Sequence, residues 1–342
     1  MRNFDEITDE VFRRRDDFET AQKQQKQTAR RRINATLTAL MIFVAVAGTV
    51  GFAAKFISGT ELFKEYFQAN GKIDLSEAQD AIIEERVIEV QESVTKDDIT
   101  VTLDGVLIHR GVAYVYMTLN APEEISLEHC NASGMIIKNE KGSRLTNSYA
   151  LGTLEYDGET NTMKYMLRGL SLRCGTSVYQ RSGGEITIVI PGFIDGSNDQ
   201  PISESIWEFT VPLTPPEEPY VDVLTEPVIC EMEDHWSGEK AEIQINALRL
   251  YELSVDLEFQ VLNGVEFRTD PRICVVLTDG TEIFTNLSGT DDNHTDSDKL
   301  SESYFESPIV AEAVDYIRIG TMGSGKDAFA FFESARIDFP QQ

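Results

Sequence analysis

The spacing of hydrophobic and polar residues changes along this chain of 342 residues and divides it into distinct segments. Apolar residues recur at helical spacing near the amino end, run together over residues 33–54, and alternate with polar residues from about Val87 onward. These patterns are typical of an amphipathic helix, a membrane-spanning helix and half-buried β-strands, respectively. The sequence therefore predicts a helical tail, one membrane helix and a large β-rich portion.

The apolar run INATLTALMIFVAVAGTVGFAA covers residues 33–54 and contains no charged side chain. As a helix it would be about 33 Å long, enough to cross a hydrocarbon core of about 30 Å. Arg30, Arg31 and Arg32 precede it, and only Lys55 follows closely. Because basic residues beside a membrane helix stay in the cytoplasm, we expect residues 1–32 inside the cell and the rest outside.

A cleaved signal peptide is the alternative interpretation of this run. The apolar core of a signal peptide is usually about 7–15 residues long, shorter than the run seen here. The clearest Ala-x-Ala pattern, at residues 45–47, lies inside the run and not after it. We therefore favour an uncleaved anchor and a single-pass protein of the cell membrane.

The predicted cytosolic tail, residues 1–32, has one apolar face at helical spacing, formed by Phe4, Ile7, Val11 and Phe18. So short a segment buries little core by itself, and an exposed amphipathic helix often binds in the groove of a partner. We take these four residues as candidate partner-binding positions. The alternative is a tail that packs near the membrane or remains disordered.

Residues 55–86 predict a helical stalk that follows the membrane helix. Leu62, Phe63, Tyr66 and Phe67 form an apolar patch, and Asn70-Gly71 is a helix stop signal. The patch is suited either to the lipid interface or to packing on the first outer domain.

Short alternating strands with turn signals between them continue to the carboxyl end and predict a mainly β fold. Trp207 alternates with Phe209 and Val211, which favours burial of the tryptophan. A Pro-rich linker at 214–219 separates two β segments. The pattern predicts two tandem immunoglobulin-like antiparallel β-sandwich domains, at 87–213 and 220–342.

The two predicted β domains resemble each other in the order of their strand patterns. Two long strands at 99–119 correspond to those at 243–262, and the hairpin at 134–145 corresponds to that at 275–284. Two closing strands follow in each case. This weak internal repeat predicts two related domains.

The first 32 residues and the rest of the chain differ in net charge. The whole chain has a net charge of −28, of which the first 32 residues contribute +2, so residues 33–342 carry −30. An acidic outer portion argues against binding nucleic acid or docking on anionic lipid, because both need basic side chains.

All four cysteines, Cys130, Cys174, Cys230 and Cys274, follow the membrane segment. An even number in an exported region predicts disulfides. Three pairings are possible, and we favour Cys130–Cys174 with Cys230–Cys274, because each bridge then stays within one predicted domain. Zinc binding is the competing interpretation, but no pair has the C-x-x-C spacing.

Motifs for catalysis or cofactor binding are incomplete. The stretch GTMGSGK at 320–326 has the spacing of a phosphate-binding loop but is followed by Asp327, where Ser or Thr would bind Mg²⁺. The acidic stretch at 291–298 lacks the glycine and the final glutamate of a calcium loop. We therefore expect no enzymatic activity, no cofactor and no bound metal.

Three stretches carry a resemblance to a known group: VFRRRDDFETAQKQQKQTARRR, GTELFKEYFQ and SVTKDDITVTLDGVLIHRGVAYVYMTLNAP. The chain resembles single-pass membrane proteins of Gram-positive bacteria that are associated with extracytoplasmic-function sigma factors. The resemblance implies an anti-sigma-factor-like regulator, whose tail acts on a sigma factor in response to an unknown outer ligand or protein. A membrane-anchored surface binding protein without a regulatory tail is the alternative.

Overall fold

The computed structural model describes residues 58–171, 178–214, 218–234, 237–291, 298–322 and 331–340. The predicted tail with Phe4, Ile7, Val11 and Phe18, the predicted membrane helix, Cys174 and the acidic loop at 292–297 lie outside these ranges. Within them, no helix has the length and apolar character needed to cross a bilayer. The described residues all belong to one compact unit that spans residues 57–342.

Two helices come first. Helix α2 (Gly59–Gly71) ends at the predicted stop signal, and α3 (Glu77–Arg86) runs directly into the first strand. Ser58 Oγ accepts a hydrogen bond from the Glu61 N–H at 3.2 Å and caps α2. Ser76 caps α3 in a reciprocal capping box with Gln79, which is why the chain restarts a helix at this point.

The first β region, residues 87–213, forms three antiparallel sheets among its described residues. One has the order β1-β2-β3-β7-β6, the second β11-β8-β5, and the third β10-β9-β4. Its elements are β1 (Val87–Lys96), β2 (Ile99–His109), β3 (Val112–Asn120), β4 (Cys130–Ala132), β5 (Ile136–Asn139), β6 (Thr146–Asp157), β7 (Thr162–Ser171), α4 (Val178–Ser182), β8 (Glu185–Ile190), β9 (Phe193–Asp195), β10 (Gln200–Ser203) and β11 (Trp207–Pro212).

The second β region, residues 220–339, follows the linker and contains one continuous nine-stranded sheet. Its order is β12-β14-β15-β18-β17-β16-β19-β20, and β13 also pairs with β14. Its elements are β12 (Tyr220–Asp222), β13 (Val228–Glu233), β14 (Lys240–Tyr251), β15 (Ser254–Val261), β16 (Arg272–Leu277), β17 (Glu282–Asp291), β18 (Asp298–Phe305), the 3₁₀ turn η1 (Ala311–Ala313), β19 (Val314–Met322) and β20 (Phe331–Asp338).

The prediction of a mainly β, antiparallel fold is confirmed, and in the second β region one strand is shared between two groups of strands. Strand β17 pairs with β16 through its first residues, up to Phe284, and with β18 from Thr285 onward. A strand shared in this way joins the two groups into one continuous series of paired strands. The alternating pattern alone does not contain this information, because it fixes the buried face of a strand and not its neighbour.

The same strand order occurs in both β regions. The series β1-β2-β3-β7-β6 corresponds to β13-β14-β15-β18-β17, and β11-β8-β5 corresponds to β20-β19-β16. Both long hairpins also carry an irregularity in register, between Leu103 and Gly105 in β2 and between Ile245 and Ala247 in β14. The internal repeat seen in the sequence thus coincides with a repeat of topology.

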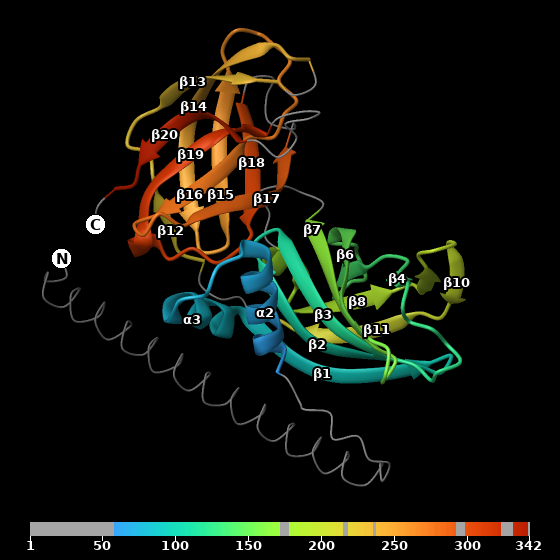
Figure 1. Ribbon diagram of the computed structural model, residues 1–342. Coiled ribbons are helices and arrows are strands. Elements are labelled where there is room, and N and C mark those ends of the chain that lie inside the picture. Colours follow the sequence, from blue (N-terminus) through green and yellow to red (C-terminus); the bar gives the residue numbers. More distant parts are fainter. Residues whose placement is uncertain are drawn as a thin grey trace, which may run out of the picture. The chain divides into compact units, whose positions relative to one another are not determined.

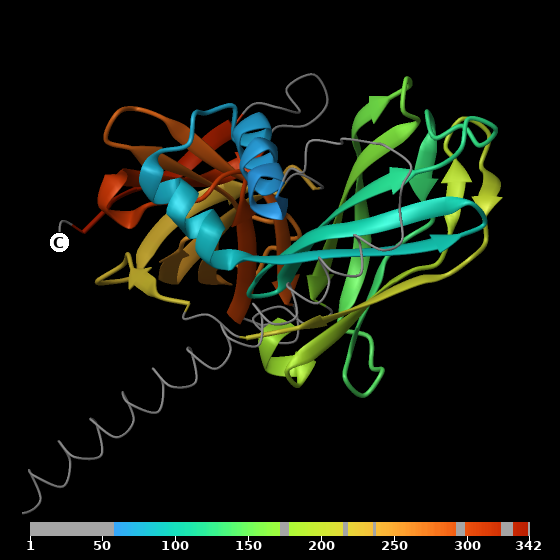
Figure 2. The ribbon, with the colours of Figure 1, turned by 90° about the horizontal axis from the view of Figure 1, so that it is seen from below.

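Separate hydrophobic cores fill the two regions. Trp207 is fully buried in the first core and packs edge-on against Phe193 with ring centroids 4.9 Å apart, as the alternation around it predicts. The core of the second region contains Phe259 and Phe267. Helix α2 packs against β1, β2 and β3 on the other face of the first sheet (Figures 1 and 2).

Candidate functional site at the junction of the two β regions

The apolar patch of α2 is buried in a third hydrophobic cluster. Leu62, Phe63, Tyr66 and Phe67 are each at most 7% exposed. The cluster also contains Tyr114, Tyr116 and Met166 of the first β region and Leu253 and Tyr304 of the second. The sequence left open whether this patch meets lipid or an outer domain, and the structure places it against protein. Helix α2 therefore contributes to a cluster that both β regions share.

The amino end of α2 is held by one carboxylate from β1. Glu89 accepts hydrogen bonds from the N–H groups of Gly59 and Thr60, both at 2.7 Å, and from the Thr60 hydroxyl at 2.6 Å. A carboxylate is favourable there because the free N–H groups and the dipole of a helix give its first turn positive character. Gly59 is required at this contact, since a Cβ on it would lie 2.8 Å from the carbonyl oxygen of Asp104.

Helix α3 links the first β region to the second. Gln79 donates a hydrogen bond from Nε2 to the carbonyl oxygen of Pro308 at 2.7 Å. Arg86, at the end of α3, donates from Nε and Nη2 to the Glu252 carboxylate at 3.0 and 2.5 Å. The Arg86 side chain is only 2% exposed, so this ion pair is screened from water on its basic side.

Equivalent hairpins of the two regions meet at this place. The β2–β3 turn begins at Arg110, and the β14–β15 turn begins at Glu252, at the corresponding positions of the repeat. Arg110 donates from Nη2 to Asp256 at 2.7 Å and from Nε to Glu302 at 3.1 Å. Its guanidinium also stacks 4.1 Å from the centre of the Tyr251 ring. We call this set of contacts, with Arg86–Glu252 and His109–Ser254, the junction.

His109 and Ser254 form a buried hydrogen bond across the junction. His109 Nε2 lies 2.8 Å from Ser254 Oγ, and neither residue has exposed surface. A serine hydrogen-bonded to a histidine is one part of a nucleophilic catalytic site. This pair is buried, so a substrate has no access to it. Burial lowers the pKa of His109 well below its usual value, and the nearby Arg86 and Arg110 lower it further.

Asp256 is the buried acid of the junction. Burial raises its pKa to about 6, although the Arg110 guanidinium acts in the opposite direction. Its Oδ2 atom accepts from Arg110, while Oδ1 is buried without a hydrogen-bond partner. Two carboxylates, Asp256 and Glu302, thus share one guanidinium. The arrangement binds charge, and within the described residues no group of three or more His, Cys, Asp or Glu side chains is placed to hold a metal.

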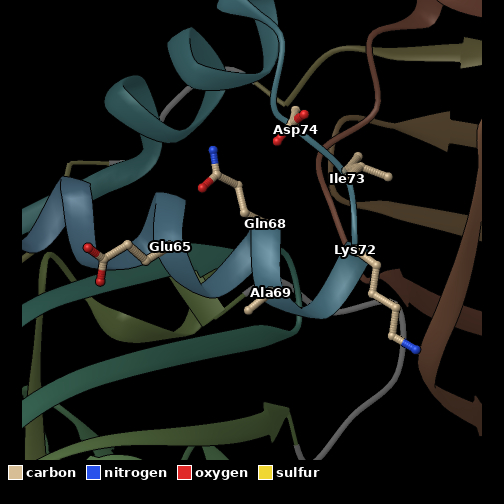
Figure 3. Close-up of a pocket in the computed structure, with 6 residues that line it drawn as sticks. All are labelled: Glu65, Gln68, Ala69, Lys72, Ile73 and Asp74. Atoms are coloured by element: carbon tan, nitrogen blue, oxygen red, sulfur yellow. The ribbon is translucent and has the colours of Figure 1, made fainter.

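A small open hollow of about 430 Å³ lies at the carboxyl end of α2 (Figure 3). Its lining residues are Glu65, Gln68, Ala69, Lys72, Ile73 and Asp74. Lys72 adopts a left-handed conformation at the end of the helix, with φ of 52°. Figure 3 shows its side chain directed away from Gln68 and Asp74, so the polar groups do not converge on one point.

The cysteine predictions need correction. Cys130, Cys230 and Cys274 are free thiols, so neither the Cys130–Cys174 bridge nor the Cys230–Cys274 bridge is present. Cys230 lies on β13, which pairs with β14, whereas Cys274 lies on β16, between β17 and β19. Cys274 instead accepts a hydrogen bond on Sγ from Arg318 Nη2 at 3.1 Å. The placement of two cysteines in one predicted domain did not bring Cys230 and Cys274 onto neighbouring strands.

The junction residues were not among the residues singled out from the sequence. Arg110 and Glu252 each stand in a short polar turn between two strands, where charged residues are common. The signal that distinguishes them is comparative: the repeat places opposite charges at corresponding turns. No local pattern shows that the two turns touch.

Comparisons with known proteins give a distant structural match. No protein-family model matches the chain, and no curated protein matches its sequence. A structure described as the conserved domain protein from Bacillus anthracis is similar to it, with a TM-score of 0.46 and 11% sequence identity. The match covers 74% of this chain and 92% of that one. At this level it indicates neither a family nor a function.

Proposed function

We propose that this protein is a single-pass membrane regulator similar to an anti-sigma factor. Its outer β regions receive an unknown signal, and its cytosolic tail acts on a sigma factor or another cytosolic partner. One observation carries the proposal: α2 begins at Gly59, shortly after the predicted membrane helix ends at Ala54, and is buried in a cluster shared by both β regions.

The packing of α2 supports a role in transmission. Tyr114 and Tyr116 of the first region and Leu253 and Tyr304 of the second belong to the same cluster as the helix. Close-packed interiors do not deform gradually, so a change in how the two regions meet shifts the helix between them. A shift of α2 is a change at the first structured element after the membrane.

The proposal also includes a domain architecture for the β regions. Residues 87–213 and 220–342 are then two related immunoglobulin-like β-sandwich domains outside the cell, separated by the linker at 214–219. The repeated strand order supports their relationship. Residues 33–54 anchor them, and residues 1–32 remain in the cytosol.

Scrambling residues 4–18 while keeping Arg30, Arg31 and Arg32 tests the regulatory tail in the native host. We expect the scrambled chain to cause the same transcriptional change as deletion of the whole protein, and to lose capture of the sigma factor in a pull-down. The control is the amount of each chain in the membrane, which must be equal. An unchanged transcript profile at equal amounts would support the alternative, a membrane-anchored surface binding protein.

A further inference from the structure

We propose that the junction responds to protons, with His109 favouring its opening on acidification and Asp256 favouring its closure. The response to pH is a property of the junction itself. Its role as an outer signal rests on the proposed function. The proposed response follows from what surrounds each of these two buried side chains.

His109 is suited only to the neutral state in the closed junction. Its Nε2 atom has Ser254 Oγ as a partner at 2.8 Å, while Nδ1 is buried without one. A neutral imidazole carries one N–H, which the Ser254 hydroxyl can accept. A protonated imidazole carries two, so protonation leaves a buried donor on Nδ1 unpaired, which is unfavourable.

The charges around His109 also oppose protonation. Arg86 at the end of α3 and Arg110 in the β2–β3 turn both act on it as positive neighbours. From β14, the Tyr251 ring lies 6.3 Å away, centroid to centroid. The nearby carboxylates are engaged with the arginines: Glu252 with Arg86, and Asp256 and Glu302 with Arg110.

Glu218 completes the charges near this turn. Its Oε1 accepts a hydrogen bond from the backbone N–H of Arg110 at 3.0 Å. No hydrogen bond joins any of these carboxylates to His109 among the described residues. In the part of the chain that the structure describes, no carboxylate therefore accepts a hydrogen bond from the imidazole that would compensate a charge on it.

Opening the junction exposes His109 to water, where the imidazole pKa is about 6.5. Below that pH the open state takes up a proton that the closed state excludes, so acid favours opening. Between about pH 7 and about pH 5, this uptake alone multiplies the ratio of open to closed molecules by about 25.

Asp256 acts in the opposite direction. It faces Arg110 from the first region, Arg249 and Tyr251 on β14, and Glu302 on β18, and burial raises its pKa to about 6. An acid whose pKa is raised in the closed state contributes stability below its ordinary pKa of about 4, and loses it as the pH rises through 6. When the pH falls over the same interval, Asp256 alone multiplies the ratio of closed to open molecules by about ten.

The test measures the distance between the two regions in the full-length chain, with spin labels on unnatural residues at exposed Glu123 and Glu239. Populations are compared at about pH 7 and about pH 5. On acidification we expect the ratio of open to closed molecules of the wild type to rise about two- to threefold, which is the net of the two opposing effects. In Asp256→Asn the same ratio should rise about 25-fold. In His109→Gln it should instead fall about tenfold.

Asp104→Asn is the matched control, because Asp104 is a buried acid with a pKa also raised to about 6, within the first region. It should leave the response at the junction as in the wild type. Equal responses of wild type and Asp256→Asn, or of wild type and His109→Gln, would overturn the inference. Since the two variants have opposite signs, failure of one to fold leaves the other decisive.

The two proposals fail separately. A pH-dependent distance in a protein whose scrambled tail leaves transcription unchanged would support the junction inference and contradict the regulatory function. A distance that ignores pH and both substitutions, in a protein whose scrambled tail alters transcription, would contradict the inference alone.

Discussion

At the scale of single residues, Glu89 does more for α2 than the residue at its amino cap. Ser58 satisfies one N–H of the helix, whereas Glu89 accepts from two N–H groups and one hydroxyl and attaches the helix to β1. No helix-capping pattern in the sequence predicts this contact, because the acceptor lies 30 residues beyond Gly59.

Glu89→Ala should destabilise the fold by about 1 kcal/mol, the usual cost of losing a helix cap. Chemical denaturation of the full-length chain measures the change. Glu85→Ala is the control, because Glu85 is an exposed acid nearby, with no such role in the described contacts. Equal stability of the two variants would show that Glu89 does not anchor α2.

Asp104 makes stability depend on pH within the first region. It is 6% exposed, accepts a hydrogen bond from Thr118 Oγ1 at 2.7 Å, and has a pKa that burial raises to about 6. The folded state therefore binds a proton more tightly than the unfolded chain. This group contributes stability at low pH that is lost as the pH rises through 6.

Asp104→Asn should remove about 2 to 3 kcal/mol of this pH dependence between about pH 4 and about pH 7. Urea unfolding midpoints at several pH values provide the measurement. An identical pH profile in wild type and variant would show that Asp104 does not titrate in this range.

At the scale of elements, helix α2 combines a predictable pattern with an unpredictable neighbour. Its apolar patch and its end at Gly71 follow from spacing and from the stop signal. Its partner surface does not, because β2 and β3 are apolar on both faces: Ala113 and Val115 face the first core, while Val112 and Tyr114 face the helix. A strand buried on both sides gives no sign of what covers the second side.

Phe67→Ala should cost about 3 to 5 kcal/mol, because Phe67 is 1% exposed and its removal leaves a cavity between α2 and the sheet. Thermal or chemical unfolding of the full-length chain gives the value. Ala69→Ser on the same helix is the control, since Ala69 lies in the exposed part of α2 and should change stability little. A small loss for Phe67→Ala would mean that the helix is only loosely held.

At the scale of the whole molecule, the sequence predicted the class of the fold and the repeat but not the connections between strands. Alternation of apolar and polar residues in the sequence identified β14, β15 and β19 as strands. It did not reveal that β17 joins two groups of strands, or that Cys230 and Cys274 lie on strands that do not pair with each other. Those features depend on partners far apart in the chain, and local patterns do not record them.

The meeting of equivalent hairpins has a consequence for the order of the two β regions. Arg110 and Glu252 occupy corresponding turns and carry opposite charges. Arg110 pairs with Asp256 and Glu302 of the second region, while Glu252 of the second region pairs with Arg86 at the end of α3. The regions share a strand order yet are not interchangeable: the arginines on one side need the carboxylates of the second region, which favours the pairing of unlike regions over the pairing of identical ones.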